Sequence, residues 1–329
     1  MEGACLIDVL NVDSLNVEFN INGKYFHAVN DVSFHIKEGE TLGLVGESGC
    51  GKSVTSLALV RLLSKSARVN GNVAYKGRNL LEIPKREMQQ ARGDEISMIF
   101  QEPMTSLNPV YKIGSQITEA LKLHNKITGS QADQQAIEML KKVGIARPEE
   151  IMENYPHQLS GGMRQRVMIA IAMICNPSLL IADEPTTALD VTIQAQILEL
   201  MKKLSQDFGT SILLITHDLG VVAEMCDRVA VMYAGYIIEQ GTADDIFFNT
   251  NHPYTQGLLN AIPKMDVLYK ERLQPIVGNV PSLVKMPSGC RFAARCPRVI
   301  DQCKYELPPL FEVGESHHSR CWLHNQKEA

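Results

Sequence analysis

The stretch that decides the fold is Gly46-Glu-Ser-Gly-Cys-Gly-Lys52-Ser53, which matches the pattern G-x-x-x-x-G-K-S/T at every position. It lies between a short run of β-forming residues, Thr41–Val45, and a stretch with helical character, Lys52–Leu63. Glycines at these spacings let backbone N–H groups wrap around phosphates, and the following helix directs its positive end at the same anion. The stretch therefore predicts a P-loop that binds a nucleoside triphosphate.

All eight residues of this loop are expected to take part in nucleotide binding. Lys52 would reach the β- and γ-phosphates, and the Ser53 hydroxyl would bind Mg²⁺. A glycine-rich turn without a ligand is the alternative, which the strand before the loop and the helix after it disfavour. The binding residues expected are Gly46, Glu47, Ser48, Gly49, Cys50, Gly51, Lys52 and Ser53.

A second motif, Leu179-Leu-Ile-Ala-Asp183-Glu184, is an apolar run that ends in two acids. Asp183 is placed to hold Mg²⁺ through water, and Glu184 is the expected general base that polarises the attacking water. On its own the pattern could be a buried strand that reaches a solvated loop. Together with the P-loop it indicates a P-loop nucleoside triphosphatase, a class that also contains kinases and GTPases.

The segment Leu159–Met163 narrows this class. Ser160 is a natural N-cap, and Gly161 and Gly162 expose the first N–H groups of the helix predicted at Arg164–Cys175. One nucleotide needs only one glycine-rich cradle, so a second anion-binding helix end suggests a site that another chain completes. A simple capped helix after a glycine turn is the alternative.

Two polar residues follow predicted strands elsewhere in the chain. Gln101 comes after Ile96–Phe100 and could contact Mg²⁺ or the attacking water. His217 comes after Ile212–Thr216 and could donate a hydrogen bond to the γ-phosphate and connect it to Glu184. Either residue taken alone is more typical of a surface or capping position.

The composition excludes several other classes of protein. The 329 residues carry 37 acidic against 32 basic side chains, a net charge of -5, which argues against a nucleic-acid partner. No apolar run approaches the roughly 20 residues of a membrane-spanning helix, and the first residues lack the pattern of a secretory signal. We therefore expect a cytoplasmic protein whose role at a membrane requires partner subunits.

Short apolar runs alternate with amphipathic stretches, as in α/β domains. We expect an ATPase domain over residues 1–262, with a helical subdomain at about 102–175. After residue 262 the composition shifts to Pro, Gly, Cys and His, which predicts a small irregular C-terminal module over 263–329. Further expected elements are strands at Leu179–Ala182 and Ile212–Ile215, a helix at Ile193–Phe208, and a hairpin of Val229–Met232 with Tyr236–Glu239.

In their order along the chain these motifs resemble the ATPase domain of ABC transporters, over roughly residues 6–260. The resemblance implies a head-to-tail dimer in which ATP lies between the P-loop of one chain and Leu159–Met163 of the other. Ser160, Gly161 and Gly162 would then contact the phosphate of the partner's ATP, and Gln101 with the following helical segment would couple to membrane subunits. The order is P-loop, Gln101, Leu159–Met163, Asp183–Glu184, Ala188-Leu-Asp190 and His217, with Asp190 at the dimer interface.

Longer stretches are similar to one branch of this family, the dipeptide/oligopeptide importers and their nickel-uptake relatives. Met163 stands where the common signature has Gln, and we expect no loss of activity because the phosphate contacts rest on Ser160 and backbone groups. Such systems combine two different ATPase chains, two membrane permease subunits and an extracytoplasmic substrate-binding protein. The similar stretches include Phe100-Gln-Glu-Pro-Met-Thr-Ser-Leu-Asn-Pro109, His252-Pro-Tyr-Thr255 and Gly289-Cys-Arg-Phe-Ala-Ala-Arg-Cys-Pro297.

The resemblance implies an ATP-hydrolysing subunit on the cytoplasmic face of the membrane that energises import of di- or oligopeptides. Nickel and antimicrobial peptides remain alternative cargoes, because other subunits determine specificity in such systems. A soluble ABC ATPase for translation or DNA repair is disfavoured by the single cassette and the lack of a heptad stretch. A small-molecule kinase would leave Leu159–Met163 and His217 unexplained.

The family also has an aromatic residue that stacks on adenine, shortly before the strand that leads to the P-loop. Phe19 is the expected residue here, and Tyr25 is its rival. A position in the hydrophobic core is the alternative for an aromatic side chain in such a strand-rich segment.

Four of the eight cysteines crowd into the last 40 residues, with gaps of 5, 6 and 17 residues between them. Zinc ribbons usually place paired ligands about two to four residues apart, so the looser spacing suits a wider cluster. The resemblance implies a 4Fe-4S cluster bound by Cys290, Cys296, Cys303 and Cys321. The alternatives are reduced thiols, or zinc with a histidine in place of one thiol, from among His317, His318 and His324.

Overall fold

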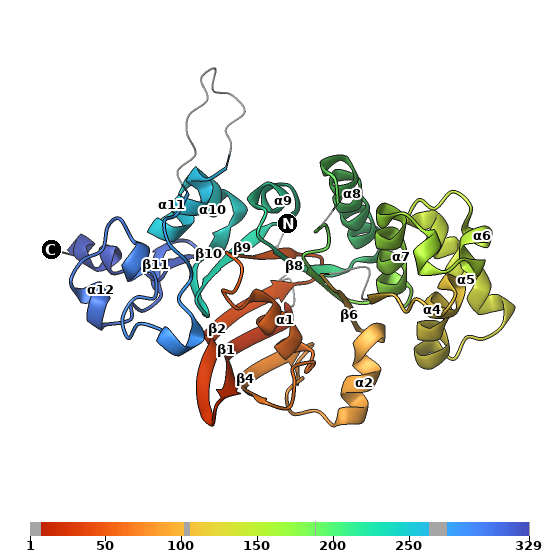
Figure 1. The fold of residues 1–329 in the computed structure, drawn as a ribbon, viewed down its shortest axis with the longest axis horizontal. Coiled ribbons are helices and arrows are strands. Elements are labelled where there is room, and N and C mark those ends of the chain that lie inside the picture. Colours follow the sequence, from red (N-terminus) through yellow and green to blue (C-terminus); the bar gives the residue numbers. More distant parts are fainter. Residues whose placement is uncertain (1–7, 102–105, 188, 263–274, 329) are drawn as a thin grey trace, which may run out of the picture. The chain divides into compact units, whose positions relative to one another are not determined.

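The computed structural model describes residues 8–101, 106–187, 189–262 and 275–328 (Figure 1). Its backbone contacts divide the chain into two compact units. The first unit comprises Met1–Leu10, Ile36–Thr41 and Tyr75–Ile215, and the second comprises Asn11–His35, Leu42–Ala74 and Thr216–Ala329. Within the described residues, no helix has the length and apolarity needed to cross a bilayer.

The first unit is built on three parallel strands, β6 (Ile96–Ile99), β7 (Leu179–Asp183) and β8 (Ser211–Thr216). β7 lies between the other two, with Ile99 opposite Ala182 and Asp183 opposite Ile215. β7 and β8 are buried along their whole length, which explains why both read as continuous apolar runs. Because the strands are parallel, their carboxyl ends meet at one edge of the sheet.

Helices make up most of the rest of the first unit. α4, α5, α6 and α7 contact one another and form a helical group (Figure 1). The helices of the unit are α2 (Lys85–Asp94), α4 (Ile113–Ala120), η1 (Leu121–Asn125), α5 (Ser130–Lys142), α6 (Pro148–Glu153), η2 (Pro156–Gln158), α7 (Gly161–Met173) and α8 (Val191–Phe208). The two-residue strand β5 (Arg78–Asn79) precedes them.

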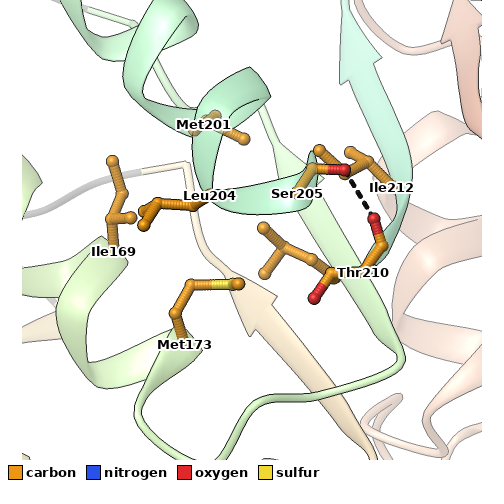
Figure 2. A pocket seen from close by; sticks show the side chains of 8 residues that line it. Ile169, Met173, Met201, Leu204, Ser205, Thr210 and Ile212 are labelled. Carbon is orange, nitrogen blue, oxygen red and sulfur yellow. Dashed lines mark hydrogen bonds between the residues drawn. The ribbon is translucent and has the colours of Figure 1, made fainter. Parts of the chain in front are cut away.

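Side chains from α7, α8 and β8 line a small apolar pocket in the core of the first unit (Figure 2). The Ser205 hydroxyl at the end of α8 donates to the carbonyl of Thr210, with 2.6 Å between Oγ and O. Gly209 between them adopts a left-handed conformation that ends the helix. This turn fixes the path from α8 into β8. The pocket residues that Figure 2 labels are Ile169, Met173, Met201, Leu204, Ser205, Thr210 and Ile212.

The second unit contains two groups of strands. In one, β1 (Asp8–Ile21) lies between β2 (Lys24–Lys37) and β4 (Ala67–Tyr75). In the other, β3 (Thr41–Val45) runs parallel to β9 (Arg228–Tyr233), with Leu42 opposite Arg228. β9 and β10 (Tyr236–Thr242) form an antiparallel hairpin. Its turn residues Ala234 and Gly235 both have positive φ, 46° and 89°, as the predicted hairpin requires.

The C-terminal segment extends this second group. β12 (His317–Ser319) pairs antiparallel with β10, and β11 (Phe311–Gly314) pairs with β12. Short helical turns make up much of the remaining C-terminal segment. They are η3 (Leu283–Lys285), η4 (Ala293–Arg295), α12 (Gln302–Tyr305) and η5 (Trp322–Glu328), and the remaining helices of the unit are α1 (Lys52–Leu59), α9 (Leu219–Met225), α10 (Ala243–Phe248) and α11 (Pro253–Asn260).

Candidate functional site

The P-loop connects β3 to α1, as the sequence predicts, and its glycines are required by space as well as by backbone conformation. Gly46 has φ 153°, and a Cβ there would lie 2.2 Å from the carbonyl oxygen of Met232. Gly51 has φ 112°, and its Cβ would lie 2.7 Å from the Met232 methyl group. A side chain at Gly46 would displace the loop from β9, because it meets backbone there. At Gly51 the Met232 side chain can move, and the left-handed φ is what favours glycine.

Lys52 opens α1, and only 5% of its surface is exposed. Its ammonium donates to the carbonyl oxygens of Gly46 at 2.7 Å and Glu47 at 3.1 Å. Ser53 follows in the first turn of the helix. The loop thus combines a helix N-terminus, a positively charged side chain and a hydroxyl group. This combination suits a phosphate with its bound magnesium ion.

Cys50, inside the loop, is buried at 1% exposure, and burial raises the pKa of its thiol. The thiol is therefore neutral near pH 7 and packs as a small apolar group. The Cys50 side chain therefore adds no charge to this loop.

The acid pair lies at the carboxyl end of β7. Asp183 is 4% exposed, and Glu184 follows with φ 48°. A left-handed conformation at a residue other than glycine costs about 1–3 kcal/mol, and such residues gather at functional sites. The Glu184 N–H donates to the Ile215 carbonyl at 2.8 Å, which holds this conformation against β8.

The carboxylate of Glu184 accepts two hydrogen bonds on the same oxygen. Gln101 Nε2 donates to Oε2 at 2.9 Å, and the Thr187 hydroxyl donates to Oε2 at 3.0 Å. The strand register explains the first contact, since Ile99 is opposite Ala182, and Gln101 and Glu184 each follow two residues later, just beyond the ends of β6 and β7. Gln101 and Glu184 were both predicted as site residues, whereas Thr187 was not. Its signal was its position three residues after Glu184.

The glycine-rich segment forms the start of α7, three residues earlier than predicted. Ser160 is the N-cap, and its hydroxyl accepts from the Met163 N–H at 3.3 Å. A Cβ at Gly162 would lie 3.1 Å from Ile193, so glycine allows α7 to pack closely against α8. Asp190 caps α8 by accepting from the Ile193 N–H at 3.0 Å. Ser160 and Asp190 are both exposed.

His217 directly follows β8 and is exposed. Phe19 in β1 is half-buried, whereas Tyr25 in β2 is 37% exposed with the guanidinium of Arg68 3.6 Å from its ring centre. The role of each in nucleotide binding stays a prediction. The P-loop, Phe19, Tyr25 and His217 belong to the second unit. The first unit contains Gln101, Ser160, Gly161, Gly162, Asp183, Glu184 and Asp190, so the meeting of the two sets at one nucleotide also stays a prediction. Ala188 lies outside the described residues.

The four C-terminal cysteines lie in the second unit, on what we call the cysteine segment, residues 289–321. Burial raises the pKa of Cys290 to about 11, and the other three thiols add to the rise. Burial also raises the pKa of Cys296 and Cys321, so these three thiols are protonated near neutral pH. Where the chain is described, no three His, Cys, Asp or Glu side chains are arranged to hold a metal ion. The geometry therefore supports neither the 4Fe-4S nor the zinc prediction.

Two of the three histidines considered as alternative ligands, His317 and His324, make other contacts. His317 Nε2 lies 3.0 Å from Glu239 in a pair that is almost completely buried. His324 Nε2 lies 3.1 Å from the Ser319 hydroxyl.

The sequence also gave no indication of two residues that reach the P-loop from the C-terminal part of the chain. Tyr254 of α11 accepts a hydrogen bond from the Glu47 N–H at 2.9 Å. Arg295 of the cysteine segment forms an ion pair with the Glu47 carboxylate. Both lie in stretches that sequence reasoning used only for their similarity to one branch of the family. Tyr254 and Arg295 are 207 and 248 residues from Glu47, and contacts at such separations leave no local sequence pattern.

A P-loop between strand and helix, an acid pair at the end of a parallel strand and a serine-capped Gly-Gly helix start define an ATPase of the ATP-binding cassette class. Residues 29–187 match the family model described as ABC transporter, and residues 238–303 match the one described as oligopeptide/dipeptide transporter, C-terminal region. The dimeric structure of MJ0796, a bacterial ABC transporter cassette, is 28% identical, with a TM-score of 0.63 over 71% of this chain and 98% of that one.

Curated relatives cover nearly the whole chain. A probable peptide ABC transporter ATP-binding protein, y4tR of Sinorhizobium fredii, is 52% identical over 97% of this chain and 96% of its own. The oligopeptide transport ATP-binding proteins AppD of Bacillus subtilis and OppD of Escherichia coli are 52% and 48% identical, over 98% and 95% of this chain and 98% and 93% of theirs. The chain belongs to the ATP-binding proteins of the oligopeptide/dipeptide transporter family, and it is an ATPase that couples ATP hydrolysis to transport.

Proposed function

We propose that this chain supplies the ATP hydrolysis that drives import of dipeptides or oligopeptides. The observation that carries the proposal is the match of residues 238–303 to the oligopeptide/dipeptide C-terminal region, together with about 50% identity to peptide-transport ATP-binding proteins. Nickel and antimicrobial peptides are alternative cargoes, because the residues that select cargo belong to other subunits.

In this function the P-loop holds the phosphates through its backbone N–H groups and Lys52. The oxygen groups of Ser53, Asp183 and Gln101 suit Mg²⁺, which prefers hard oxygen ligands and keeps several waters. When bound, the ion neutralises charge that builds up on the phosphate oxygens. The position of Asp183 at the buried carboxyl end of β7 supports its part in this ligand set.

Glu184 acts as the general base for water. The water oxygen forms a bond to the γ-phosphorus while its proton passes to the Glu184 carboxylate, and the bond to the bridging oxygen breaks, with its electron pair leaving on ADP. The hydrogen bonds from Gln101 and Thr187 support this role, because they fix the plane of the carboxylate before water arrives. His217 would contact the γ-phosphate, and Phe19 or Tyr25 would stack on adenine.

Hydrolysis takes place in a head-to-tail dimer with a second ABC ATPase chain. Ser160, Gly161 and Gly162 contact the ATP held by the partner, and Asp190 lies at the dimer interface. The exposure of Ser160 and Asp190 at two helix N-termini supports this arrangement. Two permease subunits and an extracytoplasmic binding protein complete the importer, and this chain sits on the cytoplasmic face of the membrane.

We further propose that residues 1–262 form the ATPase domain and that residues 263–329 form a module able to hold a 4Fe-4S cluster. The four cysteines between residues 290 and 321 support the cluster, because four cysteine thiolates are its usual ligand set. The thiols would have to move to act together as ligands. Anaerobic purification and metal analysis test the cluster. Iron and sulfide with broad visible absorbance support a 4Fe-4S cluster, and zinc alone supports a zinc site. If neither metal is found, the four cysteines are reduced thiols.

The transport function is tested by uptake of labelled dipeptides, longer peptides and nickel in cells that carry wild-type protein or Glu184→Gln as their only copy. Loss of peptide uptake alone supports the proposal. Loss of nickel uptake alone would keep the motor role and overturn the peptide cargo. Unchanged uptake of all three would overturn import of these cargoes by this ATPase.

A further inference from the structure

Glu47, the second residue of the P-loop, is held at three points within the second unit. Its N–H donates to the Tyr254 hydroxyl at 2.9 Å, its carbonyl accepts from Lys52 at 3.1 Å, and its carboxylate receives both terminal nitrogens of Arg295. A carboxylate in a loop that binds phosphate is unfavourable unless a cation compensates it. The first two contacts fix the peptide backbone, and the third compensates the charge.

The guanidinium of Arg295 is held in a fixed position against the Glu47 carboxylate. Nη1 donates to Glu47 Oε2 at 2.6 Å and Nη2 to Oε1 at 2.9 Å, which is the bidentate geometry of arginine with a carboxylate. Its remaining donors bind the Tyr233 hydroxyl at 3.3 Å and the carbonyls of Ile276 at 3.3 Å and Val277 at 3.0 Å. All five N–H groups of the guanidinium therefore have acceptors, and its side chain is only 5% exposed.

An aromatic cluster fixes the base of this arginine. Phe292 packs edge-on against Tyr233 and Tyr254, with ring centres 5.3 Å apart in each case. Tyr233 ends β9, Tyr254 belongs to α11, and Phe292 lies three residues before Arg295 between Cys290 and Cys296. Phe292 and Tyr254 are buried at 2% and 0% exposure. The cluster thus anchors the cysteine segment beside the P-loop and sets the position of the guanidinium.

We propose that Arg295 is a positioning residue for nucleotide binding, by which the cysteine segment holds the P-loop in its phosphate-binding form. It acts through Glu47, whose charge it neutralises and whose carboxylate it keeps turned toward the C-terminal part of the unit. The inference rests on the P-loop binding ATP and is independent of the cargo. A change in the conformation of the cysteine segment then alters the affinity of the P-loop for nucleotide. Arg295 directly precedes Cys296, so the two residues move together.

The test is a double-mutant cycle on the purified full-length chain, with ADP affinity measured by calorimetry because ADP is not hydrolysed. Arg295→Met leaves the Glu47 carboxylate uncompensated beside the phosphate and is expected to weaken ADP binding about tenfold or more, as for loss of a charge-assisted hydrogen bond. Glu47→Gln alone removes the carboxylate but keeps the loop backbone, and its ADP affinity is the reference for the double variant. The double variant Arg295→Met with Glu47→Gln should recover most of the affinity, because no charge remains to compensate.

The KM for ATP should rise with Arg295→Met while kcat stays within about twofold, since the chemistry is untouched. Arg295→Lys keeps the charge without the two-pronged geometry and should fall between wild type and Arg295→Met. Arg320→Met is the matched control. Arg320 is also buried in the C-terminal part of the unit, but it donates to the carbonyls of Ile237 and Pro308. Its loss should lower the melting temperature and leave ADP affinity unchanged.

A purely structural role for Arg295 would give a different result. Arg295→Met would then lower the melting temperature as Arg320→Met does, with unchanged ADP affinity in the folded protein, or the double variant would bind no better than Arg295→Met. Either result overturns the proposal. If the wild-type chain binds neither ADP nor ATP, both the proposed function and the role of Arg295 are wrong. If the wild type binds nucleotide and the variants bind it equally well, only the role of Arg295 is wrong.

Discussion

Gln101 donates a hydrogen bond from Nε2 to Oε2 of Glu184, at 2.9 Å, across the neighbouring parallel strands β6 and β7. The register places the two residues level with each other, two positions beyond the paired Ile99 and Ala182. Because Glu184 also has a left-handed backbone, its carboxylate is oriented by strand pairing, by the side chains of Gln101 and Thr187, and by local strain together. A general base fixed in this way loses little entropy when water binds to it.

Replacing Glu184 with Gln should stop hydrolysis without loss of ATP binding. The amide keeps the size of the carboxylate but cannot accept the proton of the attacking water, and such a loss costs about 10²–10⁴-fold in rate. Phosphate release and ATP binding by the same preparation measure both effects. Glu199→Gln, an exposed change on α8, is the matched control and should keep the wild-type rate. Hydrolysis by Glu184→Gln at the wild-type rate would mean that another group is the base.

Gln101→Ala should lower kcat about tenfold, because the Glu184 carboxylate loses the hydrogen bond from Gln101 while that from Thr187 remains. The KM for ATP should change less than kcat, since Gln101 donates directly to the Glu184 carboxylate and would reach the nucleotide only through its proposed contact with Mg²⁺. Steady-state kinetics separate the two constants. A raised KM with unchanged kcat would show that Gln101 acts in binding, and no change in either would remove it from the site.

Two roles of Ser160, as the N-cap of α7 and in the proposed contact with ATP, can be measured separately. Ser160→Asp keeps a good N-cap for α7, so the melting temperature should stay within a few degrees of wild type. The added negative charge would repel the partner's phosphates, and ATP hydrolysis by the dimer should fall by at least tenfold. Ser160→Ala should instead lose about 1 kcal/mol of stability. Full activity in Ser160→Asp would show that the residue only caps the helix.

The elements around the motifs could be predicted from the sequence because their signals are local. β3, β7, β8 and the β9–β10 hairpin read as apolar runs bounded by glycine or acids, and the structure confirms them with ends that differ by at most three residues. α7 begins earlier than predicted because the cap at Ser160 outweighs the low helix propensity of Gly161 and Gly162.

Other features could not be predicted because they depend on pairing between distant residues. β1 mixes buried and exposed positions without clean alternation, and β2 alternates only over residues 31–37, so the sequence marks the segment as rich in strands but not how its strands pair. The contacts of Tyr254 and Arg295 with Glu47 arise because α11 and the cysteine segment fold back to the P-loop. Sequence reasoning therefore found the residues expected to touch the nucleotide and missed those that position them.

Because of His252, we expect the free energy of unfolding to decrease as the pH is lowered below neutral. The ring is buried, its Nδ1 accepts from the Tyr254 N–H at 3.0 Å, and burial lowers the pKa of the imidazole to about 4 from 6.5. Between these values the unfolded chain binds a proton that the folded chain excludes, so the free energy of unfolding rises with pH and is lost as pH falls below 6.5. From pH 7.5 to pH 5 the loss should be about 2 kcal/mol.

The same pH series can separate His252 from its acidic neighbour. Hydrogen bonds, led by that from His317, hold the pKa of Glu239 below 4.5 despite its burial, so Glu239 stabilises the fold above this pH and loses that contribution only at lower values. Chemical denaturation at pH 7.5 and 5 therefore isolates the histidine. His252→Asn keeps an N-cap for α11 but cannot titrate, and its free energy of unfolding should be nearly the same at both pH values. If His252→Asn loses as much stability as wild type, the pH dependence comes from another group.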